Sequence, residues 1–417
     1  MGDIFCISPN QKIVGDIFVS GDKSISHRAV ILSSIRDEIT TISNLLLADD
    51  VLNTVEAMRE LGVEIIIDEE KKSARVYGVG LHGLKAPKNP INCGNSGTAM
   101  RLLCGLLCAQ KFNSILIGDD SLSKRPMLRV AEPLRLMGAK INLSENNTAP
   151  IEIIGSQKLN AISYELKIPS AQVKSAILLA SLYAQGETFV HEKTKTRDHT
   201  EKMLACNNIE IKIPGDISSA AFFIVLAAIT KDSNLIIREV GVNPFRTGII
   251  DILKLMGANI KIFNKTFFGN EPVADIQIQY APLHGRTIPQ ELISNAIDEF
   301  PIIFIAAATA KGNTLLRGAK ELRVKESDRI ACMKKNFDAL NIQTEEYNDG
   351  ILIYGDQAFH GGRVDSFGDH RIAMSFAIAG NVAKDPVFVD NCELIKTSFP
   401  NFLKLAKQVG MKVCNTE

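Results

Sequence analysis

The sequence lacks an excess of either charge. Its 417 residues include 47 Lys and Arg and 47 Asp and Glu, so the formal net charge at pH 7 is zero. Proteins that bind nucleic acid or anionic membranes through a broad positive field carry a surplus of basic residues. We therefore expect neither of these partners, and any site for an anion must be local.

Long apolar runs are also missing. No uninterrupted apolar stretch is long enough to cross a bilayer, and the start, Met1 to Cys6, lacks the basic, apolar and small-residue order of a secretory signal. Hydrophobic residues make up 46% and charged residues 23%, which is typical of an ordinary globular protein. We expect a cytoplasmic location.

Cysteine is present, but not at the spacing of a metal site. The eight cysteines form no Cys-x-x-Cys pair and have no nearby His at zinc-ligand spacing. Cys104 and Cys108 share one face of an apolar, helix-like run, which is typical of buried reduced thiols. We predict no metal and no structural disulfide.

Five short segments place a Lys or Arg beside Gly or small hydroxyl residues where an apolar, helix-like run begins. Backbone N–H groups, hydroxyls and guanidinium groups in such places bind phosphate and carboxylate oxygens. Each segment alone is more often an ordinary turn or a solvated helix start. Five of them in one chain favour an enzyme of phosphorylated metabolites. The segments are 21–28, 94–101, 124–127, 323–329 and 368–371.

The chain is longer than a single hydrophobic core usually grows, so we expect two domains. Six predicted helices end at a Gly or Asn before a strand, because these residues tolerate the left-handed conformation that ends a helix. The six ends predict six similar α/β units. They lie at Gly62, Gly138, Asn208, Gly257, Asn341 and Gly410.

The third unit is shorter than the others. Asn208 and Gly257 are 49 residues apart, whereas the other neighbouring helix ends are 69 to 84 residues apart. The run Ile211 to Ile213 leads directly into Pro214-Gly215-Asp216, so this unit lacks its closing strand or strands, and we place the main domain boundary there. We expect the apolar helices at 175–184, 220–230, 302–310 and 372–379 to be buried at each domain's centre, with sheets outside.

Four distinctive motifs follow one another along the chain. They are Asp-Lys-Ser-Ile-Ser-His-Arg, Asn-Ser-Gly-Thr-Ala-Met-Arg, Ser-Ala-Gln-Val-Lys-Ser-Ala and Arg-Val-Lys-Glu-Ser-Asp-Arg. In these motifs and their order, from Gly21 to Pro400, the chain resembles the enolpyruvyl transferase family, and specifically its shikimate-pathway branch. The resemblance implies an α/β (α+β) fold of two similar domains, each with three βαβαββ units, buried central helices and outer mixed sheets. The first domain is expected at 19–214 and the second at 1–18 plus 215–417, with the active site in the cleft between them.

The resemblance also implies the reaction. The enolpyruvyl group of phosphoenolpyruvate is transferred to the 5-hydroxyl of shikimate 3-phosphate by addition and elimination, and phosphate is released without any metal or organic cofactor. Both substrates carry a carboxylate and a phosphate, in agreement with the number of cationic segments. We expect a monomer that acts on small molecules on the route to chorismate and aromatic amino acids.

Site residues follow from the resemblance position by position. Ala171 stands where part of the family has Ser, so that hydroxyl contact is absent. Contacts to shikimate 3-phosphate are expected from Lys23, Ser24, Arg28, Ser170, Ala171, Gln172, Arg197, Asp298 and Lys325. Contacts to phosphoenolpyruvate are expected from Lys23, Asn95, Gly97, Arg125, Gln172, Arg329, Arg371 and Lys396.

Catalysis needs proton transfers, because the attacking hydroxyl loses a proton and the methylene carbon of the enol gains one. The resemblance implies Asp298 as the base near the hydroxyl and Glu326 as the carboxyl that moves a proton to the methylene, with Lys23 and His370 as partners. Without the resemblance, Asp298 would be assigned as a helix cap before Pro301 and His370 as a core histidine.

Three alternatives remain open. The related transferase that acts on a UDP-amino sugar, UDP-N-acetylglucosamine, usually carries a reactive Cys on a first-domain loop, but the loop from Gly118 to Arg125 has none. A non-catalytic phosphometabolite sensor should have lost its acidic site residues, and an RNA-end-processing relative should have a basic surface. For any of these functions, the shortened third unit could leave a sheet edge open or loosen the segment that carries Arg197.

Overall fold

The computed structural model describes residues 3–10 and 12–416. The chain divides into two compact units, which we describe separately. The first unit consists of Gly21–Ile213 and the short segment Phe268–Glu271. The second unit consists of the chain up to Ser20, Pro214–Phe267 and the part from Pro272 onward.

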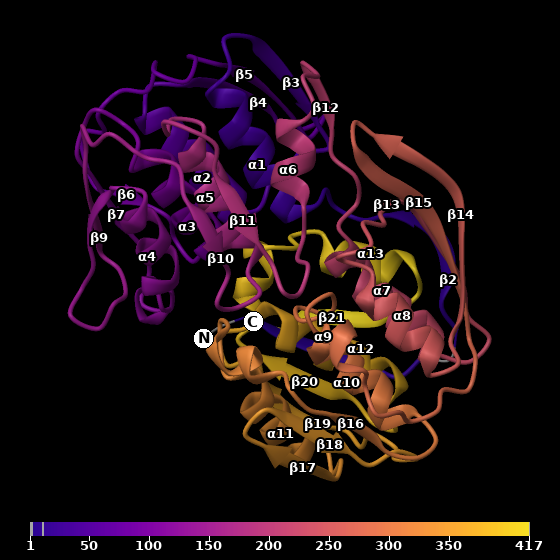
Figure 1. Ribbon diagram of the computed structural model, residues 1–417. Coiled ribbons are helices and arrows are strands. Elements are labelled where there is room, and N and C mark those ends of the chain that lie inside the picture. Colours follow the sequence, from indigo (N-terminus) through magenta and orange to yellow (C-terminus); the bar gives the residue numbers. More distant parts are fainter. Residues whose placement is uncertain (1–2, 11, 417) are drawn as a thin grey trace. The chain divides into compact units, whose positions relative to one another are not determined.

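The first unit has two four-stranded sheets and one two-stranded sheet, with the orders β12-β3-β5-β4, β6-β7-β9-β8 and β10-β11 (Figure 1). Its strands are β3 (Ile39–Ser43), β4 (Glu64–Asp68), β5 (Ser73–Tyr77), β6 (Ile91–Asn92), β7 (Ser114–Ile117), β8 (Lys140–Asn142), β9 (Ile151–Ile154), β10 (Ser163–Glu165), β11 (Phe189–His191) and β12 (Glu210–Lys212). Its helices are α1 (Lys23–Ser34), α2 (Asp49–Glu60), α3 (Gly97–Leu107), α4 (Leu128–Leu136), α5 (Ala171–Ser181) and α6 (His199–Leu204).

The second unit has three sheets, with the orders β14-β15-β13-β2, β16-β18-β17 and β19-β20-β1-β21. Its strands are β1 (Ile4–Ser8), β2 (Val14–Phe18), β13 (Asn234–Gly241), β14 (Asn259–Phe268), β15 (Glu271–Gln279), β16 (Thr314–Leu316), β17 (Thr344–Tyr347), β18 (Gly350–Ile353), β19 (Gly362–Asp365), β20 (Val387–Asp390) and β21 (Lys412–Thr416). Its helices are α7 (Ile217–Ile229), α8 (Gly248–Leu255), α9 (Gln290–Ile293), α10 (Phe300–Thr309), α11 (Arg329–Ala339), α12 (His370–Val382) and α13 (Phe402–Gln408).

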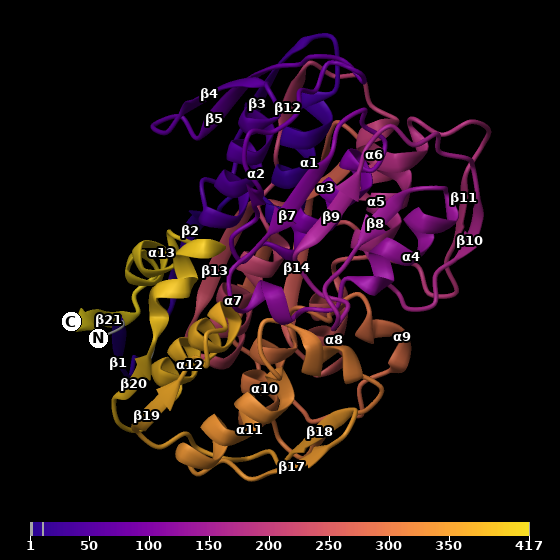
Figure 2. The same cartoon turned by 90° about the vertical axis from the view of Figure 1, so that its left-hand side faces the viewer.

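Apolar helices occupy the centre of the second unit, as expected. The helices α7, α10 and α12 contact one another, and nearly all their residues are buried (Figure 2). A helix that is apolar on every side is stable only when protein surrounds it, which explains why the sheets lie outside. The predicted helix at 175–184 is α5, which ends three residues earlier, at Ser181. None of the described helices is long and apolar enough to cross a membrane.

The first unit has its own core around α1, α3 and α5. Cys104 and Cys108 lie in this core, as predicted, and burial raises the pKa of the Cys104 thiol to about 12. At neutral pH this thiol is therefore protonated and packs as a small apolar side chain.

The sheets repeat one pattern. In the sheet of β6 to β9, β6 and β7 are parallel, and the closing hairpin adds β9 antiparallel to β7 and β8 at the edge. The sheet that ends the chain follows the same pattern with a strand from the other terminus, because β1 lies antiparallel between β20 and β21. Local periodicity cannot reveal this pairing, since its partners are about 400 residues apart in sequence.

The third repeat of the first unit lacks its closing hairpin, as the short interval predicted. Among the described residues, β11 pairs only with β10. The next strand, β12, leaves this repeat and pairs in parallel with β3 in the first sheet. The strand at Glu210–Lys212 therefore exists, but it closes a different sheet.

Five of the six predicted helix ends have the left-handed conformation, at Gly62, Gly138, Gly257, Asn341 and Gly410. The prediction for Asn208 is wrong. Its helix, α6, ends at Leu204, and Asn208 does not have a positive φ. The Arg36 guanidinium instead binds the carbonyls that follow this helix, with Nη2 2.5 Å from Cys206 O and Nη1 2.8 Å from Asn208 O. The carbonyls of the last turn of α6 are satisfied within the segment, by Ala205 N to Glu201 O and Cys206 N to Met203 O.

Candidate active site

Lys23 is the first residue of α1 in the first unit. The carboxylate of Asp22 caps this helix by accepting a bond from Ile25 N at 2.8 Å. Lys23 Nζ lies 2.9 Å from Asp50 Oδ2 on α2, and the two side chains are 17% and 10% exposed. The ion pair holds the ammonium at the start of the helix, beside the half-buried Ser24.

Arg28 lies one turn further along α1 and is buried. It donates from Nη1 to Ser24 O at 2.8 Å, from Nε to Thr200 Oγ1 at 2.7 Å and from Nη2 to Ser175 Oγ at 2.7 Å. Burial, and after it the positive charge of Arg197, lower the pKa of Arg28 to about 10. Because the two guanidinium groups repel each other, a bound anion would stabilise both.

The start of α5 carries three of the candidate residues. Ser170 caps the helix by accepting a bond from Val173 N at 3.4 Å, and Ala171 is its first residue. Gln172 donates from Nε2 to Thr98 Oγ1 at 2.9 Å and so joins α5 to α3. The first turns of these two helices therefore lie together, and α1 joins them through the bond from Arg28 to Ser175.

Two guanidinium groups converge at Gly97, the first residue of α3. A Cβ atom on Gly97 would lie 3.0 Å from Arg101 Nη1 and 3.3 Å from Arg125 Nη1. Asn95 accepts a bond from Arg125 Nη2 at 2.6 Å, and Arg101 Nη1 donates to Gln172 Oε1 at 2.5 Å. Two guanidinium groups at a helix N-terminus are a favourable place for a phosphate or carboxylate.

Arg101 was not among the predicted site residues, although it belongs to the motif Asn-Ser-Gly-Thr-Ala-Met-Arg. Arg101 lies four residues after Gly97 on the same helix, so the two share one face. That spacing was the signal that could have identified it.

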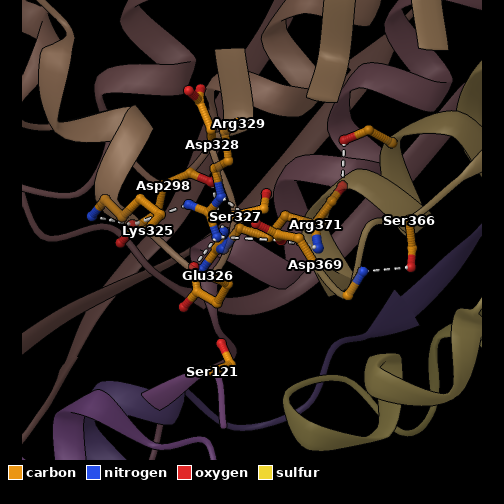
Figure 3. A network of polar contacts seen from close by, with 12 residues as sticks. Ser121, Asp298, Lys325, Glu326, Ser327, Asp328, Arg329, Ser366, Asp369 and Arg371 are labelled. Carbon is orange, nitrogen blue, oxygen red and sulfur yellow. Dashed lines mark hydrogen bonds and ion pairs between the residues drawn. The ribbon is translucent and has the colours of Figure 1, made fainter. Parts of the chain in front are cut away.

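The second unit holds a separate cluster of charged residues around Arg329 (Figure 3). Lys325 Nζ lies 3.1 Å from Asp298 Oδ1, and Arg329 Nη1 lies 3.8 Å from the same oxygen. Arg329 Nη2 donates to Glu326 Oε2 at 2.5 Å. The cluster therefore brings both predicted catalytic carboxylates, Asp298 and Glu326, to one guanidinium group.

Asp369 is the buried anion of this cluster, and the sequence analysis did not select it. Its Oδ2 accepts a bond from Arg329 Nε at 2.7 Å, and its Oδ1 caps α12 by accepting from Arg371 N at 2.9 Å. Burial, the largest single effect, raises the pKa of Asp369, but the charges of Arg329 and His370 and the hydrogen bond from Arg329 together outweigh it, so the net shift is downward. Asp369 therefore stays ionised and fixes the starts of α11 and α12 together.

Glu299 is a second buried carboxylate that the sequence did not identify. Its Oε1 lies 3.6 Å from Arg371 Nη1 and accepts a short bond from Ser218. Arg371 Nη1 also donates to Asp298 O at 2.9 Å. Glu299, not Asp298, occupies the cap position of α10, so the alternative role of Asp298 as that helix's cap is wrong.

Two further candidates lie in the second unit. His370 is buried as the first residue of α12. Lys396 is exposed near the end of the short 3₁₀ segment Cys392–Thr397. Apart from Lys396, the candidates form one set around the starts of α1, α3 and α5 in the first unit, and another around the starts of α10, α11 and α12 in the second. Helix N-termini and Arg or Lys side chains both attract anions, so each set suits a phosphorylated, carboxylated ligand.

Comparison with known proteins agrees with this chemistry. The family model described as EPSP synthase (3-phosphoshikimate 1-carboxyvinyltransferase) matches residues 7–212 and 205–405. Relatives named 3-phosphoshikimate 1-carboxyvinyltransferase include those of Alkalilimnicola ehrlichii, 49% identical over 98% of this chain and 96% of the relative, and of Methylococcus capsulatus, 50% identical over 98% of both.

Solved structures give the same result. An EPSP synthase from Acinetobacter baumannii matches with a TM-score of 0.88 and 45% identity over 100% of both chains. The enolpyruvyl transferase NikO from Streptomyces tendae matches with a TM-score of 0.78 at 14% identity over 100% of this chain and 99% of that one, which supports the fold alone. This chain belongs to the EPSP synthase family.

Proposed function

We propose that this member of the EPSP synthase family transfers the enolpyruvyl group of phosphoenolpyruvate to the 5-hydroxyl of shikimate 3-phosphate. The reaction belongs to the shikimate pathway, which leads to chorismate and the aromatic amino acids. The observation that carries the proposal is the near-complete match to relatives with this activity in their names, at about half of all positions identical. The two sets of cations and carboxylates at helix starts support it.

The reaction proceeds by addition and elimination. In the addition, the 5-oxygen bonds to C2 of the enol and loses its proton, while C3 gains a proton and becomes a methyl group. In the elimination, the bond from C2 to the phosphate oxygen breaks, C3 loses a proton, and inorganic phosphate leaves. Each step moves one proton to or from carbon, so the site needs groups that can both give and accept a proton.

In the first unit we assign shikimate 3-phosphate to Ser24, Arg28, Ser170, Gln172 and Arg197. The mutual repulsion of Arg28 and Arg197 supports this assignment, since a phosphate beside them would neutralise both. Gln172 also serves phosphoenolpyruvate, whose further contacts come from Lys23, Asn95, Gly97 and Arg125. We add Arg101 to this second group, because it converges with Arg125 on Gly97.

In the second unit Arg329, Arg371 and Lys396 bind the phosphate and carboxylate of phosphoenolpyruvate. Lys325 binds shikimate 3-phosphate, and its Nζ lies 3.1 Å from Oδ1 of Asp298, the residue that accepts the hydroxyl proton. Glu326 moves the proton to and from C3, and the bond from Arg329 fixes the direction of its carboxyl group. Lys23 and His370 assist these transfers.

We further propose that the chain acts as a cytoplasmic monomer and that the domain boundaries lie at 19–214 and at 1–18 plus 215–417. The UDP-amino sugar alternative predicts a different acceptor. The sensor alternative predicts binding without turnover, although Asp298 and Glu326 are both present.

The test measures phosphate release from phosphoenolpyruvate with shikimate 3-phosphate or UDP-N-acetylglucosamine as acceptor. We expect release only with shikimate 3-phosphate, and a fall in kcat of about 100-fold or more in Glu326→Gln, since general acid–base groups contribute factors of that size. Glu60→Gln, an exposed change on α2, is the matched control and should not alter the rate. Release with the UDP-amino sugar, or with neither acceptor, would exclude the proposed reaction.

A further inference from the structure

The turn between β14 and β15 belongs to the first unit, although most of both strands belongs to the second. This turn, 268–271, lies against α6 and the strand after it. Glu271 Oε1 is 2.6 Å from His199 Nδ1. Asn270 Nδ2 donates to Lys202 O at 3.0 Å, and Lys212 Nζ lies 4.2 Å from the centre of the Phe268 ring. The turn therefore contacts the helix and the strand on either side of Asn208.

The bond between Glu271 and His199 is shielded from water. The two side chains are 6% and 3% exposed. An average hydrogen bond makes only a small net contribution to stability. Removing one partner of a buried bond to a carboxylate costs more, because the other partner stays desolvated without a hydrogen bond. This contact therefore fixes where α6 begins.

The position of α6 matters because residues on and beside this helix interact with Arg28. Thr200, the residue after His199, accepts the bond from Arg28 Nε at 2.7 Å and donates to Ser175 Oγ at 2.7 Å. Ser175 in turn accepts from Arg28 Nη2. Arg197 lies two residues before His199 and acts on Arg28 through its charge. A shift of α6 would move both Thr200 and Arg197 relative to Arg28.

The repeat that contains α6 provides little support of its own. The helix has six residues, and among the residues that the structure describes no closing hairpin follows it, because β12 pairs with β3 in another sheet. Isolated helices of this length are unstable in water, so the position of α6 must come from tertiary contacts. The turn at 268–271 supplies such contacts in place of the missing hairpin.

We propose that Glu271 is a positioning residue for shikimate 3-phosphate. It acts through His199, holding α6 so that Thr200 orients the Arg28 guanidinium and Arg197 lies at the same anion site. This inference rests on the proposed function, which assigns Arg28 and Arg197 to that substrate. We assign Glu271 no direct contact with the substrate, since its side chain is buried against His199.

The test compares three variants. Glu271→Met removes the acceptor at similar volume, Glu271→Gln keeps an oxygen that can accept from His199, and Lys265→Met changes an exposed residue of β14 as the control. For Glu271→Met we expect the KM for shikimate 3-phosphate to rise about tenfold, the loss typical of a buried hydrogen bond, with the KM for phosphoenolpyruvate changed less than about twofold. In Glu271→Gln the KM for shikimate 3-phosphate should return most of the way to the wild-type value. Lys265→Met should have the same KM values as the wild type.

Hydrogen exchange gives an independent measurement. The amides of α6 should exchange faster in Glu271→Met than in the wild type, while those of α3 should not. If Glu271→Met does not fold, Asn270→Ser, which removes only the bond to Lys202 O, should shift the same KM and the same amides by less.

The outcomes separate the two proposals. An unchanged KM for shikimate 3-phosphate, or an equal rise for both substrates, would overturn the role of Glu271. Unchanged exchange in α6 would also overturn it, even in a wild type that shows no turnover. Absence of turnover with shikimate 3-phosphate in the wild type would reject the proposed function instead.

Discussion

Arg329 and Asp369 form a buried, two-point ion pair. Arg329 Nε lies 2.7 Å from Asp369 Oδ2 and Nη2 lies 3.4 Å from Oδ1, and the two side chains are 1% and 0% exposed. The pair joins the first residue of α11 to the cap of α12. Arg329 Nη2 also donates to Glu326 Oε2, and Nη1 lies 3.8 Å from Asp298 Oδ1. The buried carboxylate that orients Arg329 therefore differs from the two proposed for catalysis.

Asp369→Asn tests this division of roles. The Asn side chain can still cap α12 through its oxygen, but the substitution removes the negative charge that balances the buried Arg329. Breaking one side of a buried ion pair destabilises a protein by about 3 kcal/mol. We expect a loss of that order in urea unfolding, together with a higher KM for phosphoenolpyruvate.

The control for this change is Asp338→Asn, which removes a partly exposed ion pair with Lys334 within α11. Such pairs contribute less than about 1 kcal/mol, so this variant should unfold like the wild type. If Asp369→Asn and Asp338→Asn lowered the free energy of unfolding equally, the Arg329–Asp369 pair would contribute no more to stability than an exposed ion pair.

Gly97→Ala should weaken the binding of phosphoenolpyruvate. The added Cβ would lie 3.0 Å from Arg101 Nη1 and 3.3 Å from Arg125 Nη1, so at least one guanidinium must move. We expect the KM for phosphoenolpyruvate to rise about tenfold, since charge-assisted bonds depend on close alignment. Steady-state kinetics with each substrate varied in turn gives the comparison.

The matched glycine is Gly241, where an added Cβ meets only ordinary contacts at 3.4 Å or more. Gly241→Ala should keep both KM values. A Gly97→Ala enzyme with wild-type kinetics would show that this space does not hold a ligand.

His27 makes stability depend on pH. It is fully buried, with Nδ1 2.7 Å from Thr54 Oγ1, and burial first, then the charges of Lys23 and Arg28, lower its pKa well below 6.5. Below pH 6.5 the unfolded chain takes up a proton at this position and the folded chain does not. The free energy of unfolding therefore falls with decreasing pH, by up to about 1.4 kcal/mol per pH unit from this group.

Urea unfolding of wild type and His27→Gln between pH 7.5 and 5 measures this slope. In His27→Gln the free energy of unfolding should fall less steeply with decreasing pH, because the titrating group is gone. The variant should also be less stable at pH 7.5, because the bond to Thr54 changes. His360→Gln, at an exposed histidine, should keep the wild-type slope. Equal slopes for wild type and His27→Gln would mean that His27 is protonated in the folded protein.

Much of the fold could be predicted from local patterns, because its signals lie within a few residues of one another. Gly62 and Gly138 end helices where a left-handed residue is needed, and the apolar run after Asp216 predicts the buried helix α7. The prediction for Asn208 is wrong because α6 already ends at Leu204, and Arg36, remote in sequence, binds the carbonyls of Cys206 and Asn208 in the segment that follows. Tertiary contacts of this kind override a local preference.

Of the candidate site, the sequence indicated the residues within motifs but not the partners that orient them. Asp369 and Glu299 are buried acidic residues whose role depends on Arg329 and Arg371, which lie 40 and 72 positions away in sequence. Spacing along the chain carries no information on these two pairs. For Arg101 the spacing of four residues from Gly97 was a signal, and its convergence with Arg125 on Gly97 makes it a candidate.

The sequence by itself determined the repeating α/β units, their buried helices and the cationic segments at helix starts, since hydrophobic periodicity and helix ends are local properties. The tertiary structure decided which helix starts meet, that β1 pairs with β21 and β12 with β3, and that Glu271 contacts α6. The physical reason is that strand register and buried ion pairs depend on packing between segments far apart in the chain, where many pairings satisfy the same local pattern.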